Sequence, residues 1–516
     1  MPTPEPVSGQ VFDLHERELL RQGLKQRHIQ MIALAGTIGT GLFLSSGQVI
    51  SQSGPAGAII GYSVIGLLVS GVLVSIAELS ALLPLSGGII RHAERIVDPA
   101  LSFAQGWNTV YAYFISIPGE IVAATVLVQF WISVNSAIWI TVFGGVLILC
   151  NLSLIRIYGE LEFSFAILKI MLIVGLNLMA LVLVCGGGPT GEVYGVRFWR
   201  NPGPFTQYLN IPGALGQFLG VWRAFTPAVY SYASVENVTL LAGETQNPRK
   251  NIPRAAKRIV WRVIIFYVIT IFMITLLVPS NDPNLLKSTG TAAQSPFVLA
   301  ADRAGVAVVP SIINFVVLTI LMGGSRVLLG LSQEKHAPAF VSKVNRLGVP
   351  YVSVAMMSLS ICLGYLTVSS GAATVFTWLQ NLIAAFNYIA WMIICIVYLR
   401  FYYAMKKQGI SRDELPWKVP LQPYAAWTSF SCFFILLLTG GFTTFIDGWS
   451  TQIFLSAYLD IAIVLVLYLG YKVWKKTKLI PLDEVPLRYY LDQAHRNPEP
   501  PDAKKSGWGR LNILWG

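Results

Sequence analysis

The sequence predicts an all-α polytopic membrane protein with twelve transmembrane helices. Of its 516 residues, 54% are hydrophobic and only 12% are charged, and the mean hydropathy is +0.61. Soluble proteins carry about 25% charged residues, so this composition excludes a soluble protein. Apolar stretches of about 20 residues, long enough to cross a bilayer, recur along the chain. In order, they are residues 31–51, 57–83, 107–133, 137–155, 162–186, 213–241, 260–279, 307–331, 351–370, 374–399, 427–446 and 453–473.

The distribution of positive charge orients these spans. The net charge is +12, from 37 Lys and Arg against 25 Asp and Glu. Most of these cations lie in the two tails and in alternate loops, and the remaining loops hold only Arg197, Arg200, Lys287 and Arg303. The positive-inside rule therefore predicts that both termini are cytoplasmic. Because the charge follows the loops in this way, it indicates membrane topology and gives no support to nucleic acid binding.

Two polar tails flank the membrane domain, which we place at residues 31–473. The N-terminal tail, 1–30, runs directly into a full-length span, so we expect no cleavable signal peptide. The C-terminal tail, 474–516, is polar and contains prolines, which indicates a regulatory or a disordered segment. Both tails are expected in the cytoplasm, where Lys25, Lys504 and Lys505 are candidate acceptors of ubiquitin from trafficking machinery.

Two spans contain interruptions that weaken a helix. Span one begins MIALAGTIGTGLFLSSG and carries Gly36, Thr37, Gly39, Thr40 and Gly41 at its middle. Unwound backbone is tolerated at bilayer depth only where it faces a cavity or protein. Span six contains Pro227, which removes a backbone donor, followed by a run of small polar residues. Interruptions five spans apart predict an inverted-repeat transporter with a midplane site. The alternative is that the glycines only let helices pack closely.

Six ionisable residues lie inside predicted spans, where charge is costly and usually functional. Glu120 in span three either carries a proton or makes a static hydrogen bond to a neighbouring helix. Glu236 follows the span six interruption, and we expect it to anchor the next half-helix. The full set is Glu78, Glu120, Lys169, Arg223, Glu236 and Asp460.

The two cations in this set leave alternatives open. Lys169 in span five either presents its ammonium to the unwound carbonyls of span one or extends to the inner membrane surface. Arg223 either attracts a carboxylate or faces the extracellular vestibule. Asp460 has no evident partner in the sequence.

No pattern indicates an enzyme. The five histidines all lie in tails or predicted cytoplasmic loops, without metal-ligand spacing, and no phosphate-binding loop is present. We therefore expect no catalytic residues, no cofactor, no metal and no ATP-driven pump on this chain.

Five motifs in order, over about residues 20 to 475, carry a resemblance to a known family. They are RHIQMIALAGTIGTGLFLSSG, LPLSGGIIRHAERIVDPALSFAQGWN, YGELEFSFAILKI, GETQNPRKNIPRAAKR and RFYYAMKKQGISRDELPWKVPLQPY. The chain resembles the fungal amino acid permeases of the amino acid, polyamine and organocation superfamily. The resemblance implies a LeuT-like fold, in which ten helices form a 5+5 inverted repeat with discontinuous helices 1 and 6, and helices 11 and 12 are additional.

The resemblance also implies proton symport of amino acids into the cell across the plasma membrane. The backbone of Thr37, Ile38, Gly39, Thr40 and Gly41 is then expected to receive the substrate α-carboxylate. Span six is expected to contribute an aromatic lid and backbone acceptors for the α-amino group. Lys169 and Glu120 match positions associated with proton coupling. The span six residues are Tyr230, Ser231 and Ala233, with Pro227 and Glu236 at the helix break.

The chain departs from the family pattern at two positions. Ser234 stands where relatives usually have glycine, and Asn237 follows Glu236 where leucine is usual. The substrate therefore cannot be transferred from relatives. A carrier of choline, a polyamine or γ-aminobutyrate is one alternative, and a nutrient sensor that does not transport is another, although such sensors carry longer cytoplasmic extensions.

Overall fold

The computed structural model describes residues 39–85, 87–129, 134–152, 155–189, 191–236, 239, 247–286, 295–303, 305, 351–446, 448–496 and 499. Regular structure in these residues is helical. Eight stretches among them are long and apolar enough to cross a membrane. The helices are α3 (Thr40–Phe43), α4 (Ser45–Leu82), α5 (Ile89–Ile96), α6 (Pro99–Val128), α7 (Ser136–Leu152), α8 (Ile155–Val184), α9 (Arg197–Arg200), η1 (Tyr208–Asn210), α10 (Ala214–Ser231), α12 (Pro248–Leu277), α13 (Pro283–Leu286), α14 (Pro296–Arg303), α17 (Tyr351–Ser358), η5 (Leu359–Leu366), α18 (Thr367–Ser370), α19 (Ala372–Lys407), η6 (Arg412–Glu414), α20 (Tyr424–Thr439), α21 (Thr443–Ile446), α22 (Thr451–Lys475) and α23 (Leu487–Arg496).

The predicted spans coincide with these helices wherever the structure describes them. Spans three to seven correspond to α6, α7, α8, α10 and α12, and spans ten and twelve correspond to α19 and α22. Span nine is divided among α17, η5 and α18, and span eleven between α20 and α21. The predicted span eight, 307–331, and the N-terminal part of span one lie outside the described residues.

Helix α4 contains the end of span one and all of span two. Its 38 residues would extend about 57 Å as one straight helix, almost twice the hydrocarbon thickness. Gly54 has non-helical angles (φ 78°, ψ 175°) and divides α4 into the segments 45–53 and 55–82. A Cβ atom at Gly54 would lie 2.7 Å from the Pro204 carbonyl oxygen, so both the backbone angles and the close approach require glycine.

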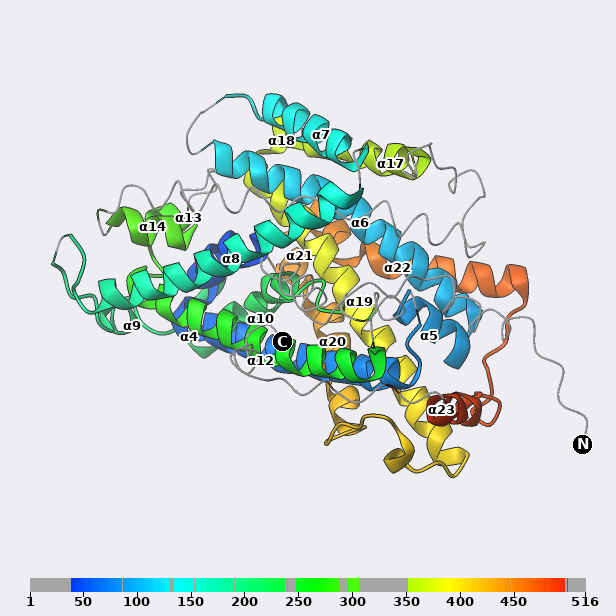
Figure 1. The fold of residues 1–516 in the computed structure, drawn as a ribbon. Helices are drawn as coiled ribbons and strands as arrows, with labels where there is room; N and C mark the ends of the chain where they lie inside the picture. Colours follow the sequence, from blue (N-terminus) through cyan, green and yellow to red (C-terminus); the bar gives the residue numbers. More distant parts are fainter. Residues whose placement is uncertain are drawn as a thin grey trace, which may run out of the picture.

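The spans form two groups of neighbouring helices. Helix α4 packs against α10 and α12, and α8 lies along α12 (Figure 1). Helix α19 packs against α6, α20 and α22, and it also contacts α10 and α4. Because α10 and α19 contact each other, they bring the two groups together around the centre of the molecule.

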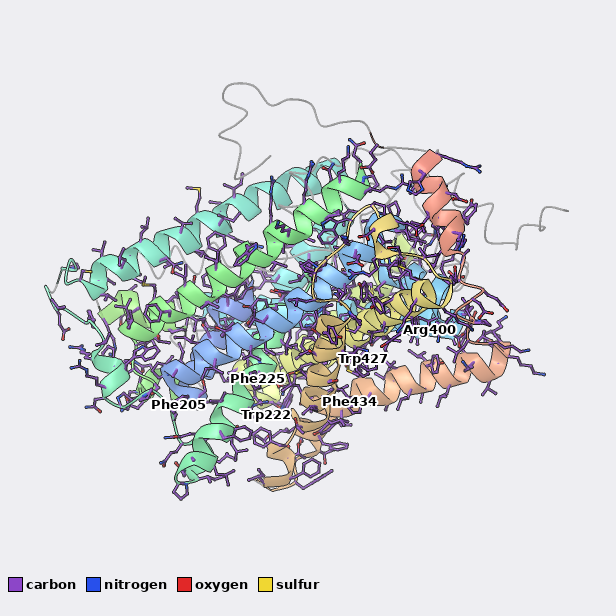
Figure 2. The ribbon with its side chains drawn as sticks, turned by 90° about the horizontal axis from the view of Figure 1, so that it is seen from below. Phe205, Trp222, Phe225, Arg400, Trp427 and Phe434 are labelled. Atoms are coloured by element: carbon purple, nitrogen blue, oxygen red, sulfur yellow. The ribbon has the colours of Figure 1, made fainter. Side chains whose placement is uncertain are left out.

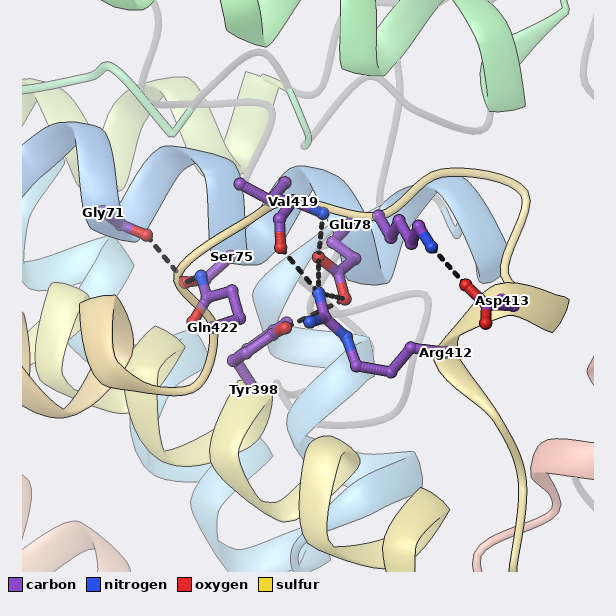
Figure 3. Close-up of polar contacts among 9 residues, drawn as sticks. Gly71, Ser75, Glu78, Tyr398, Arg412, Asp413, Val419 and Gln422 are labelled. Atoms are coloured by element: carbon purple, nitrogen blue, oxygen red, sulfur yellow. Dashed lines mark hydrogen bonds and ion pairs between the residues drawn. The ribbon is translucent and has the colours of Figure 1, made fainter.

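A polar network holds the C-terminal end of α4. The charge pattern predicts that this end is cytoplasmic, and we call it the inner end. Glu78 is buried there, and Arg412 Nη2 donates to both of its carboxylate oxygens at 2.9 Å. The Tyr398 hydroxyl and the Val419 backbone N–H also donate to Glu78, at 2.9 and 2.8 Å (Figure 3). Gln422 donates to Ser75 at 2.7 Å beside them. The network joins α4 to α19 and to the connection between α19 and α20.

The beginning of the C-terminal tail is folded against this inner end. Helix α23 buries Leu487, Tyr490 and Leu491. Ahead of it, the Ile480 N–H donates to the Val97 carbonyl at 2.9 Å, which joins the tail to the segment after α5. The alternative of a disordered tail is therefore wrong for residues 476–496, because apolar side chains on one face of α23 find buried positions.

His92 on α5 makes the inner end sensitive to acid. It is fully buried, its Nε2 lies 2.8 Å from the Leu83 carbonyl oxygen, and burial lowers its pKa to about 4. In the unfolded chain His92 takes up a proton near pH 6.5, whereas in the folded protein it stays neutral until the pH approaches 4. The free energy of unfolding is therefore highest above about pH 6.5 and decreases as the pH falls toward 4. We expect the free energy of unfolding to decrease by about 3 kcal/mol between pH 6.5 and pH 4.

Melting of the detergent-solubilised protein checks this prediction. The melting temperature of the wild type should fall between neutral pH and about pH 4.5 by more than that of His92→Gln. Equal pH dependence in the two proteins contradicts the assignment.

Candidate functional site

A cavity lies between α5, α6, α10, α19 and the start of α3. Its lining combines apolar side chains with a few polar groups, as ligand sites usually do. The described lining residues are Gly39, Gly41, Ile89, Ile90, Gln105, Thr109, Ala112, Tyr113, Ser116, Glu120, Tyr230, Ser231, Ala233, Ser234, Glu236, Ile383, Phe386, Asn387, Ala390 and Ile394.

Most of the predicted site residues that the structure describes meet at this cavity. Gly39 and Gly41 from span one lie opposite Tyr230, Ser231 and Ala233 from span six, and Glu120 and Glu236 complete the lining. Thr37 and Ile38 lie outside the described residues. Thr40 begins α3, and its side chain also lies outside what the structure describes.

Spans one and six, both of which the sequence predicts to be interrupted, touch each other at the cavity. A Cβ atom at Gly41 would lie 2.7 Å from Ser231 Cα and 2.9 Å from Ser231 Oγ, closer than non-bonded atoms approach. At Gly39, by contrast, no described atom lies within 4 Å of the Cβ position. Gly41 therefore permits a close backbone contact, whereas Gly39 leaves space in the cavity.

Helix α10 ends at Ser231, between the two residues predicted at the break, Pro227 and Glu236. Pro227 is inside α10, which continues to Ser231, and Pro227 does not line the cavity. The Ser231 hydroxyl donates to the Pro227 carbonyl at 3.0 Å, and the Tyr267 hydroxyl donates to the Ser231 carbonyl at 2.7 Å. The backbone N–H groups of Tyr232 and Ala233 bond to the carbonyls of Ala228, Val229 and Tyr230, and the Tyr267 hydroxyl satisfies that of Ser231, so the last four carbonyls of α10 are paired.

Three buried tyrosines support this helix end. The Tyr62 hydroxyl lies 3.2 Å from Ser231 Oγ, and the Tyr232 hydroxyl donates to the Tyr62 carbonyl at 3.0 Å. The Tyr232 and Tyr267 rings stack with their centroids 4.7 Å apart. Tyr62 and Tyr267 come from α4 and α12, so the sequence held no local signal for this cluster.

Past Ser231 the chain leaves the helix. Ser234 has a positive φ of 68°, a backbone conformation that favours glycine over serine. The Trp391 indole donates to Glu236 Oε2 at 3.0 Å, which ties the turn to α19. The half-helix that Glu236 is expected to anchor lies almost entirely outside the described residues.

Polar residues of α6 form one face of the cavity, and sequence reasoning found only one of them. Gln105, Thr109, Ser116 and Glu120 recur at intervals of three to four residues or multiples of them, and all line the cavity. This periodic polar stripe in an apolar span was a usable signal. The described lining carries two carboxylic acids and no Lys or Arg.

Two of the remaining ionisable residues lie away from the cavity lining. Lys169 is 6% exposed on α8, so it is not extended into the inner surface, and it does not line the cavity. Asp460 is fully buried on α22, where Asn108 of α6 donates to it at 3.5 Å. In the residues that the structure describes, no three His, Cys, Asp or Glu side chains are grouped as metal ligands.

Known proteins resemble this chain both in sequence and in fold. The amino acid permease family matches residues 28–482. The chain is 37% identical over 482 residues to the proline-specific permease of Saccharomyces cerevisiae, covering 90% of this chain and 77% of that protein. It is 36% identical over 502 residues to the dicarboxylic amino acid permease of the same yeast, covering 94% and 82%.

A solved structure shows the same LeuT-like fold. The manganese transporter of Eremococcus coleocola aligns with a TM-score of 0.56 over 94% of this chain and 97% of that one. The two are only 13% identical, so this likeness concerns the fold alone. From the family match, the sequence relatives and the helical architecture, we conclude that the chain belongs to the amino acid permease family.

Proposed function

We propose that this amino acid permease imports its substrate across the plasma membrane together with protons, with both termini in the cytoplasm. Members of the family are transporters, not enzymes. The observation that carries the proposal is the contact between Gly41 and Ser231, where two interrupted spans meet at one cavity. Such paired interruptions provide backbone groups that bind substrate at the midplane.

The two helix ends suit the two charges of an amino acid. Leu44 keeps helical angles (φ −100°, ψ −48°), so residues 40–53 form a nearly continuous helical run whose N-terminal end lies at the cavity. Its free N–H groups carry positive partial charge, and the C-terminal end of α10 carries negative partial charge. We propose that the α-carboxylate binds the Thr37–Gly41 backbone and that the α-ammonium binds near Ser231, with Tyr230 over the substrate.

The charges of the lining favour a neutral or cationic substrate side chain over an acidic one. Glu120 and Glu236 lie on the cavity, and its described lining contains no basic side chain to pair with a second carboxylate. The named relatives include permeases for proline, for dicarboxylic and for basic amino acids, so the family alone does not decide this.

Competition for labelled substrate in a permease-deficient fungal strain tests this proposal. Neutral or basic amino acids should compete, and aspartate and glutamate should not. Strong competition by the dicarboxylic amino acids overturns the proposed side-chain class. Competition by choline or a polyamine, which lack the carboxylate, supports the carrier of a related amine instead.

We propose Glu120 and Lys169 as the groups that couple transport to protons. Glu120 lies on the cavity, where substrate binding changes its surroundings. Lys169 is buried on α8, which packs against α12 beside the break, and a buried ammonium changes its proton affinity readily.

Lys169→Ala should reach the plasma membrane and lose accumulation against a gradient, because the coupling cation is gone. We expect the accumulation ratio at acidic external pH to fall by about tenfold or more, while exchange of substrate continues. Uptake with an imposed pH gradient in proteoliposomes measures this. Lys407→Ala removes an exposed lysine paired with Asp483 and serves as the control, with unchanged uptake. Full accumulation by Lys169→Ala removes Lys169 from the coupling role.

A further inference from the structure

Arg223 is a cation buried in the middle of α10. Only 8% of its surface is exposed, and its Nε atom has no hydrogen-bond partner. Among the residues that the structure describes, no carboxylate pairs with its guanidinium. A charge at this depth is costly unless an opposite charge offsets it, so an anion is expected nearby.

Arg223 lines a second, smaller cavity between α10, α19, α20 and the start of α22. This cavity is separate from the substrate cavity. Asn381 and Tyr388, which line it, lie on one side of α19 at a spacing of two helical turns. Phe386 and Ala390, which line the substrate cavity, lie on the opposite side of α19. Helix α19 therefore stands between the two cavities.

The described side chains that line this cavity supply hydrogen-bond donors and include no carboxylate. Thr226, Tyr388 and Thr443 contribute hydroxyl groups. Asn381 also lines the cavity, but its amide N–H group donates to Ser456 Oγ at 3.4 Å, so it is not counted among the donors. The Thr226 and Tyr388 hydroxyls lie 3.5 Å apart, and Tyr388 is 3% exposed. Hydroxyl and guanidinium groups that line the same cavity are the donors that an anion requires.

Contacts between α10 and the end of α20 lie beside this cavity. The Trp222 indole donates to Thr439 Oγ1 at 3.0 Å, and Figure 2 shows Trp222 and Phe225 together on α10. A Cβ atom at Gly440 would lie 3.3 Å from Thr226 Oγ1, so the chain passes close to the site. The free space that remains for a water-sized sphere is about 20 Å³, which suits a small ion.

We propose that this second cavity binds a small monovalent inorganic anion, of which chloride is the model, beside the Arg223 guanidinium. The anion neutralises the charge of Arg223, which lies on α10 close to where this helix packs against α19 and α20. It stabilises the outer half of the transporter without touching the substrate. Binding is therefore independent of which amino acid is transported.

The test measures melting of the purified full-length protein while chloride replaces gluconate at constant ionic strength. Between about 1 and 150 mM chloride, the wild type should gain roughly 3 °C. Arg223→Gln should lose this gain, and Arg200→Gln, which changes an exposed arginine, should keep it. Binding of radioactive chloride should fall at least about tenfold in Arg223→Gln.

Three outcomes overturn the proposal. The first is a wild-type protein without a response to chloride, and the second is an equal response in Arg223→Gln. The third concerns Asp447, which lies outside the described residues: if its carboxylate balances Arg223, Asp447→Asn acquires a chloride response that the wild type lacks. If Arg223→Gln does not fold, chloride binding to the wild type, competed by bromide, still decides the question.

Discussion

Gly41→Ala should abolish transport. The new methyl group would lie 2.7 Å from Ser231 Cα, a backbone atom that cannot rotate away, so α3 and the end of α10 must separate. Displacement of a binding site by about 1 Å can cost about 100-fold in rate, and we expect at least that loss of uptake. Because the closest atom belongs to the backbone, adding Ser231→Ala should not restore activity.

Gly39→Ala is the matched control for this prediction. It adds the same methyl group two residues away, where no described atom lies within 4 Å, so the fold should tolerate it. The methyl group enters the cavity where we place the substrate carboxylate, and we expect the concentration for half-maximal uptake to rise by about tenfold. Uptake kinetics at matched surface expression measure both variants. Wild-type kinetics in Gly41→Ala would falsify the proposed contact between the two spans.

Glu78→Ala should destabilise the inner end of the protein more than any surface substitution. The change leaves Arg412 without its carboxylate, and it removes the acceptor for Tyr398 and for the Val419 N–H. Breaking a buried ion pair by removing one partner costs about 3–5 kcal/mol. We expect a lower melting temperature and a smaller yield of folded transporter, measured by fluorescence-detected size exclusion after heating.

Two further variants separate the charge from the packing at this site. Glu78→Gln together with Arg412→Gln removes both charges and should recover part of the lost stability, since no unpaired charge is left buried. The exposed pair of Lys407 and Asp483 provides the control, and its loss should cost less than about 1 kcal/mol. Equal melting temperatures for Glu78→Ala and Lys407→Ala contradict a structural role for the network in Figure 3.

The sequence predicted the helices better than it predicted their ends. Hydropathy detects the apolar part of a helix, so span seven was expected to begin near residue 260. Helix α12 begins at Pro248 because its charged first turns, including Arg249 and Lys250, are helical as well. The start of α6 could have been predicted from the sequence, because Asp98 is a residue that caps helices and Pro99 favours the first helical turn.

For the candidate site, too, the sequence predicted the general position but not the exact end of the helix. Glycine content predicted the interruption that reaches Gly41, and the residues after Pro227 predicted its counterpart. The actual end of α10 depends on Tyr267, which is 36 residues away, and on Tyr62 from another span. Such contacts between distant parts of the chain leave no pattern in one sequence. The burial of Lys169 likewise followed from the packing of α8, and the sequence left it open.

Uptake with simultaneous pH recording in proteoliposomes tests the central claim most directly. With an acidic outside, the wild type should accumulate one or more amino acids above the outside concentration, and the interior should acidify as substrate enters. A protonophore should abolish the accumulation, and Gly41→Ala should show neither signal. Accumulation without proton entry contradicts the coupling, and the absence of flux for every amino acid contradicts the account of the cavity as a substrate site.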